Sequence, residues 1–177
     1  TGGTIASRLD YRTGAVIPAF SPGELFGAVP ELADICNITT HKLYGVFSER
    51  FPEYRDFWEK MAEEELQHAD MIRSVVQDVK EGTVRFKAQL FDETSVGMFR
   101  DYLKFSLARA GEQDIPLKDA FETALAIEHD LIERSFLDLF EADTEELSLV
   151  FEGLASSTRE QHRRLLKAIE KSGQSPG

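Results

Sequence analysis

Two long stretches of this chain contain no proline, residues 53–80 and 117–171. Because proline removes a backbone hydrogen bond and clashes with the preceding turn, its absence permits helices of many turns. In the first stretch, mostly apolar residues recur at alternating steps of four and three residues, from Tyr54 and Trp58 to Val79. The second stretch holds two more segments with this spacing, beginning near Leu117 and Leu147. Such spacing is typical of helices that bury one face, so it predicts an all-α protein.

The lengths of the connections predict how these helices are arranged. A weaker periodic segment, about 24–49, precedes the first stretch by only a few residues, and Pro30 is expected to start its continuous part. The last two segments are separated only by about 141–144. Between the two pairs, alternation over 83–91 predicts an extended stretch, and Ser95 is expected to cap a short helix that Gly111 stops. Two antiparallel hairpins joined by a long crossover give the connectivity of a ferritin-like four-helix bundle.

The chain's 177 residues suffice for one domain. We expect an irregular amino-terminal arm over 1–20, a single helical domain over 21–171, and a flexible tail over 172–177. The arm combines Gly, Thr and Ser with scattered apolar residues, and the tail is rich in Gly and Ser.

Charge and composition exclude several classes of function. The formal net charge of −12 disfavours binding to nucleic acid or to an anionic membrane surface. No apolar run approaches the roughly 18 residues of a membrane span, and no signal peptide is recognisable at the start. The single cysteine, Cys36, excludes an internal disulfide. We therefore expect a soluble cytoplasmic protein.

Three polar residues occupy positions that face the expected core. Glu65 and His68 are consecutive members of the 4-3 pattern, and Glu128 has the equivalent place in the third helical segment. A bare carboxylate in such a position is unfavourable unless it is paired, protonated or bound to a metal. Carboxylate and imidazole groups suit iron, manganese or zinc, and Glu-x-x-His places two donors on one side of a metal. These three residues are the leading candidate ligands, and no catalytic residue can be assigned.

The segment around Glu65 and His68 resembles a known family. Residues 57–69, FWEKMAEEELQHA, resemble the metal-binding helix of rubrerythrin-like, ferritin-like proteins, and residues 124–133, ALAIEHDLIE, are similar to the third helix of that family. The resemblance covers about 30–171. It implies a carboxylate-bridged di-iron site used for peroxide reduction, ferrous-iron oxidation or oxygen handling, and helix faces that form a homodimer.

The family builds its site from two related halves, and here the second half departs from the pattern. Aligning the halves places Thr158 opposite Glu65 and Gln161 opposite His68, while Asn37 falls opposite Glu128. Three of six expected ligands therefore remain, which favours a single metal over a pair. The further candidates that could assist them are of lower rank: His162, Asn37, Gln161, Glu133 and His41. Tyr44 is placed to supply a hydroxyl group.

Three functional hypotheses follow from different classes of protein. The first is a metal-binding protein, with iron expected, or zinc or manganese, and a redox role toward peroxide or ferrous iron that requires an external electron donor. The second is a non-catalytic ferritin-like scaffold or homodimer without metal, in which Glu65, His68 and Glu128 form hydrogen bonds. The third and least favoured is an iron-storage cage subunit. Whether the chain is an enzyme stays open at this point.

Overall fold

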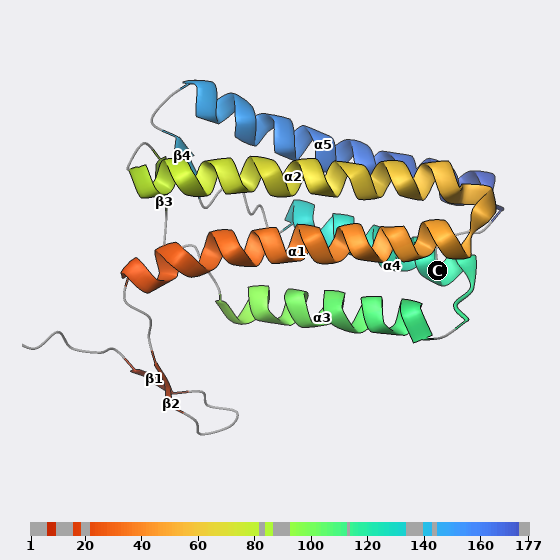
Figure 1. Cartoon of the computed structure of the whole chain (residues 1–177), viewed down its shortest axis with the longest axis horizontal. Helices are drawn as coiled ribbons and strands as arrows, with labels where there is room; N and C mark the ends of the chain where they lie inside the picture. Colours follow the sequence, from red (N-terminus) through yellow and green to blue (C-terminus); the bar gives the residue numbers. More distant parts are fainter. Residues whose placement is uncertain are drawn as a thin grey trace, which may run out of the picture.

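The computed structural model describes residues 7–9, 16–18, 22–81, 84–86, 93–112, 114–133, 140–142 and 145–173. Most of these residues lie in five helices, which confirms the predicted all-α class (Figure 1). The helices are α1 (Pro22–Arg50), α2 (Arg55–Glu81), α3 (Glu93–Glu112), α4 (Leu117–Glu133) and α5 (Glu145–Lys171). None of the helices in this described part is long and apolar enough to cross a membrane.

Helices α1 and α2 form the first antiparallel hairpin, as their short connection predicts. A single 3-10 turn, η1 (Pro52–Tyr54), joins them, with proline in its first turn, where the missing N–H has no partner to lose. The backbone N–H of Phe51 donates to the Phe47 carbonyl at 3.0 Å, so the chain leaves α1 without a break in hydrogen bonding. Helix α1 begins at Pro22 and continues through Pro30, so the expectation that Pro30 starts its continuous part is wrong.

The described residues of the crossover between α2 and α4 form one strand and one helix. The predicted extended stretch includes β3 (Val84–Phe86), which pairs antiparallel with β4 (Phe140–Ala142) in the connection before α5. The register places Val84 opposite Ala142. Helix α4 therefore ends well before the predicted join at 141–144, because the connection to α5 also supplies a strand. Helix α3 has 20 residues and lies beside α1 (Figure 1).

Short elements lie at both ends of the helical part. Strands β1 (Ser7–Leu9) and β2 (Val16–Pro18) form a small antiparallel ladder within the segment expected to be an irregular arm. At the other end, α5 stops at Lys171, and Gly173 adopts a positive φ of 71°. This left-handed conformation suits glycine and is a common way to end a helix. Residues 174–177 of the expected tail lie outside the described residues.

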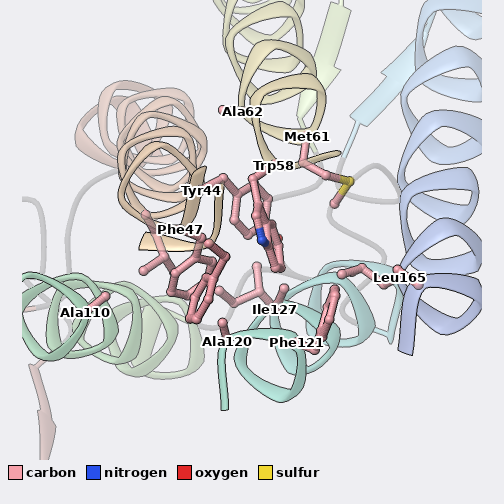
Figure 2. Close-up of a cluster of buried hydrophobic side chains, with 14 of the residues drawn as sticks. Tyr44, Phe47, Trp58, Met61, Ala62, Ala110, Ala120, Phe121, Ile127 and Leu165 are labelled. Carbon is pink, nitrogen blue, oxygen red and sulfur yellow. The ribbon is translucent and has the colours of Figure 1, made fainter. Parts of the chain in front are cut away.

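The hydrophobic core is centred on Trp58, which all the other helices approach (Figure 2). The indole ring of Trp58 lies 5.0 Å from the ring of Phe47 and 5.2 Å from that of Phe121, measured between centroids. The ring of Tyr44 is 5.7 Å away. Tilted and edge-on aromatic pairs at these distances stabilise the core beyond the area that they bury. The aromatic cluster thus holds α1, α2 and α4 together at one end of the bundle.

Replacement of Trp58 by alanine should destabilise the fold severely. The side chain is completely buried, so its loss leaves a large cavity and should lower the free energy of unfolding by about 3–5 kcal/mol. Urea denaturation followed by circular dichroism measures this change. As a control, Leu149→Ala, at a site that is 61% exposed, should change the value by less than about 0.5 kcal/mol. Equal effects of the two substitutions would contradict the proposed core.

Candidate functional site

A row of polar contacts joins α2 to α5. The amide Nε2 of Gln161 donates to Oε1 of Glu65 at 2.8 Å, and both side chains are fully buried. Nearby, the Arg164 guanidinium donates to the carboxylate of Glu64. The facing residues run in opposite directions along the two helices, as the antiparallel packing of α2 and α5 requires. Gln161 thus supplies a neutral hydrogen-bond donor to a buried carboxylate.

His68 extends this row by one turn of α2. Its Nδ1 lies 3.4 Å from Oε1 of Glu65, and its Nε2 lies 2.8 Å from the hydroxyl oxygen of Ser157 on α5. A hydroxyl group can both donate and accept, so Ser157 can pair with either tautomer of the imidazole. Both ring nitrogens of His68 therefore face protein groups.

Glu128 lies on α4 and is bound from α1. The hydroxyl group of Tyr44 donates to Oε1 of Glu128 at 2.7 Å, and both side chains are fully buried. Burial raises the pKa of Glu128 well above its usual range, and the nearby charge of Glu65 raises it further, whereas the hydrogen bond from Tyr44 acts in the opposite direction. Burial, with the charge of Glu128, likewise raises the pKa of Tyr44. Glu128 is thus favoured in its neutral, protonated form.

Several buried polar atoms of this region have no hydrogen-bond partner among the residues that the structure describes. They include the second carboxylate oxygens of Glu65 and Glu128, the carbonyl oxygen of the Gln161 amide, and the amide nitrogen of Asn37. Unpartnered buried polar groups reduce stability, each by roughly 1–3 kcal/mol. A proton on Glu128 lowers this cost, because a neutral acid is less costly to bury than a carboxylate.

The lower-ranked candidate residues do not form one group in the described part of the chain. The Nδ1 of His41 donates to the carbonyl oxygen of Ala62 at 2.9 Å, which ties α1 to α2. His162 is partly buried, and the centre of its ring is 6.4 Å from that of His129. Asn37 is buried on α1. The side chain of Glu133 lies outside the described residues.

The predicted metal-binding function is wrong. Within the described part of the chain, no group of three or more His, Cys, Asp or Glu side chains could hold a metal ion. The physical reason is that neutral side chains, Asn37, Thr158 and Gln161, stand at positions where the predicted site needed further ligands. One oxygen of each carboxylate therefore accepts a hydrogen bond from a neutral donor, Gln161 for Glu65 and Tyr44 for Glu128. The redox role expected from such a centre is wrong for the same reason.

The arrangement also limits what chemistry this region can perform. Glu65, Glu128 and Gln161 each have no exposed surface, and a substrate cannot contact a side chain that is completely enclosed. Burial raises the pKa of the Cys36 thiol to about 11, so this buried thiol is not a ready nucleophile at neutral pH. The polar contacts between the helices form a polar cluster of Tyr44, Glu65, His68, Glu128, Ser157 and Gln161, which is buried except at the partly exposed Ser157.

Comparison with known proteins indicates a different relationship for the amino-terminal part. Residues 1–84, just under half of the chain, match the family described as asparaginase, N-terminal. This span begins before the helical body and includes α1 and α2. No solved structure matches the chain.

Individual relatives match the same part, and each is the D subunit of a glutamyl-tRNA(Gln) amidotransferase. The protein of Thermococcus kodakarensis is 57% identical over 65 residues, which are 36% of this chain and 14% of that protein. The protein of Pyrococcus horikoshii is 54% identical over 65 residues, with the same coverage. That of one Methanococcus maripaludis strain is 46% identical over 85 residues, 48% of this chain and 18% of the relative. The similarity thus spans less than one fifth of the length of each of these proteins.

These matches overturn the predicted membership of the rubrerythrin-like, ferritin-like family. The prediction of an oxidoreductase, which rested on that membership, is overturned as well. The segment that suggested that family, residues 57–69, lies inside the span that matches the asparaginase family. A Glu-x-x-His pair on a buried helix face was misleading here, because Glu65 and His68 are held by Gln161 and Ser157 on α5.

Sequence reasoning also missed the importance of the amino-terminal segment. An irregular arm is predicted over residues 1–20 with no functional residue in it, although the family match begins at residue 1. The available signal was Thr1-Gly2-Gly3-Thr4, in which two hydroxyl side chains flank two glycines. Glycine lets a backbone approach a ligand closely, so this pattern was itself a reason to consider a binding segment.

The raised pKa of Glu128 predicts a specific dependence of stability on pH. Between about pH 4.5, where the unfolded state loses this proton, and the higher folded-state pKa, the folded protein binds more protons than the unfolded one. The contribution of Glu128 to the free energy of unfolding therefore falls as pH rises, by at most about 1.4 kcal/mol per pH unit. Glu128→Gln removes this titration. Urea unfolding from pH 5 to pH 8 should show the variant gaining stability relative to the parent as pH rises.

The matched control for this experiment is Glu122→Gln on the same helix. Glu122 is partly exposed and pairs with Lys118 at 3.4 Å, so its substitution should follow the pH dependence of the parent. A constant difference between Glu128→Gln and the parent across the pH range would contradict the assignment of a raised pKa to Glu128.

The hydrogen bond from Gln161 to Glu65 should contribute measurably to stability. Gln161→Leu leaves Oε1 of a buried carboxylate without its amide donor, so the free energy of unfolding should fall by about 1–3 kcal/mol. Thr158→Val is the control on the same helix, because the Thr158 hydroxyl donates to the Leu154 carbonyl of its own helix, at 3.2 Å. Thermal and urea denaturation of both variants measure the difference. A loss in Thr158→Val as large as that in Gln161→Leu would refute a special role for Gln161.

Proposed function

We propose that this chain takes part in the chemistry of side-chain carboxamides, the hydrolysis of an amide or the transfer of its nitrogen. The observation that carries this proposal is the 57% identity over 65 residues to the D subunit of a glutamyl-tRNA(Gln) amidotransferase, within a span that matches the asparaginase amino-terminal family. Both names refer to amide nitrogen, which is removed from asparagine in one case and transferred in the other. The shared chemistry of an amide carbonyl is the common element.

The residues that best suit this chemistry lie in the amino-terminal segment. Cleavage of an amide through a covalent intermediate requires a nucleophile, and threonine and serine hydroxyls serve this role in many enzymes. Thr1 and Thr4 provide two hydroxyl groups beside a glycine pair. Backbone N–H groups next to glycine are the kind of donors that stabilise a developing negative charge on a carbonyl oxygen.

The helical body supports this assignment by exclusion. Its two buried acids, Glu65 and Glu128, have no exposed surface and accept hydrogen bonds from Gln161 and Tyr44, so we do not assign the amide chemistry to them. We assign to the body the role of a stable platform, held together by the aromatic core and by the contacts between α2 and α5. The reactive groups are assigned to the matched amino-terminal segment.

The test is release of ammonia from free amides. The purified chain is incubated with L-asparagine or L-glutamine, and ammonia is measured by a coupled glutamate dehydrogenase assay. We expect release from at least one of the two amides, and a fall of at least tenfold in the double variant Thr1→Ala/Thr4→Ala.

The control lies within the same matched span. The hydroxyl group of Thr39 donates to the Ile35 carbonyl of its own helix at 2.7 Å, so Thr39→Ala should retain the parent activity. Absence of ammonia release above that of heat-inactivated protein, or full activity in the double variant, would refute the proposal.

A further inference from the structure

Helix α3 lies at one edge of the helical array and packs against α1 (Figure 1). Its inner face is buried, through Phe99, Leu103, Ser106 and Ala110. Its outer face carries Met98, Tyr102 and Phe105, which are 68%, 39% and 66% exposed. Steps of four and three residues place these three side chains on one stripe of the helix. Such a contiguous apolar stripe, unlike scattered apolar residues, marks an interaction surface.

We propose that a second copy of this chain occupies the outer face of α3, with the two α3 helices antiparallel and the two-fold axis near Tyr102. In this register, Met98 of each copy packs against Phe105 of the other, and the two Tyr102 rings meet at the axis. The stripe is therefore complementary to itself, which is the requirement for a closed two-fold dimer. This inference is independent of the proposed carboxamide chemistry.

Charge complementarity identifies the occupant and the direction. Asp101 and Lys104 are exposed and lie on the same flank of the apolar stripe. A two-fold axis near residue 102 brings Asp101 of one copy opposite Lys104 of the other, twice per dimer. Asp101 already contacts Arg100 at 3.3 Å in its own chain, and its side chain is 69% exposed, which leaves room for a second cation. In a parallel pair, the flank that carries Asp101 and Lys104 in one copy would lie on the opposite side of the interface from the same flank in the other copy. Asp101 of one copy would then not meet Lys104 of the other.

The size of the surface predicts the strength of the dimer. Three apolar side chains on about two turns of helix make a small interface, at the low end of the range for specific complexes. We therefore expect a reversible dimer that dissociates in roughly the micromolar range, and a population of monomer that grows on dilution.

Sedimentation velocity over a range of concentrations tests the dimer. The parent should shift from monomer to dimer as concentration rises, and Phe105→Asp should raise the dissociation constant at least tenfold. Leu149→Asp is the matched control, because Leu149 is nearly as exposed as Phe105 but lies on α5; it should dimerise like the parent. A monomer at all concentrations, or a dimer that Phe105→Asp leaves unchanged, would overturn the proposal.

Two further variants test the register. Asp101→Lys should weaken the dimer by placing lysines opposite each other, and the double variant Asp101→Lys/Lys104→Asp should restore it. Tyr102→Cys should form a disulfide between copies under mild oxidation, whereas Leu149→Cys should not. The native Cys36 is only 6% exposed and gives little background. Failure of the double variant to restore the dimer, or equal cross-linking of both cysteine variants, would exclude this antiparallel arrangement.

Discussion

Two carboxylates, Glu65 and Glu128, are enclosed completely in the interior of this protein, and the rest of the helical body is arranged around that constraint. A buried negative charge is unfavourable unless donors surround it or a proton neutralises it. The structure uses both solutions. Gln161 donates to Glu65, while burial and the charge of Glu65 raise the pKa of Glu128 and favour its protonated form.

The polar cluster and the aromatic core depend on each other. Tyr44 belongs to both, because its ring packs 5.7 Å from Trp58 and its hydroxyl group donates to Glu128. The hydrogen bonds to the two acids also join α1 to α4 and α2 to α5. Contacts between α2 and α5 place Ser157 and Gln161 opposite His68 and Glu65. The hydrogen bonds and the aromatic contacts of the interior therefore meet at Tyr44.

The helical class could be predicted from the sequence, because it follows from local periodicity, whereas the predicted ferritin-like arrangement of four helices was not found in the described part of the chain. The 4-3 spacing correctly predicted that Trp58, Met61, Glu65 and His68 face the core. The pairing of β3 with β4 and the length of α3 could not be predicted, since they depend on contacts between distant segments. The predicted metal site was wrong because a Glu-x-x-His pair has the same spacing whether a metal or Gln161 binds it. The match over residues 1–84 was missed because residues 57–69, which lie within it, were interpreted as a metal-binding helix.

The two buried acids are held by hydrogen bonds from neutral donors, and we infer that the fold does not require their charges. Replacing both with glutamine, in Glu65→Gln/Glu128→Gln, keeps the acceptors for Gln161 and Tyr44 and removes the ionisable groups. The melting temperature of this double variant at pH 7 is the most direct test. We predict a melting temperature equal to or above that of the parent, because the variant no longer buries groups that can carry a charge. A clear fall in the melting temperature would contradict it, and would show that the charges themselves bind a group that the fold needs.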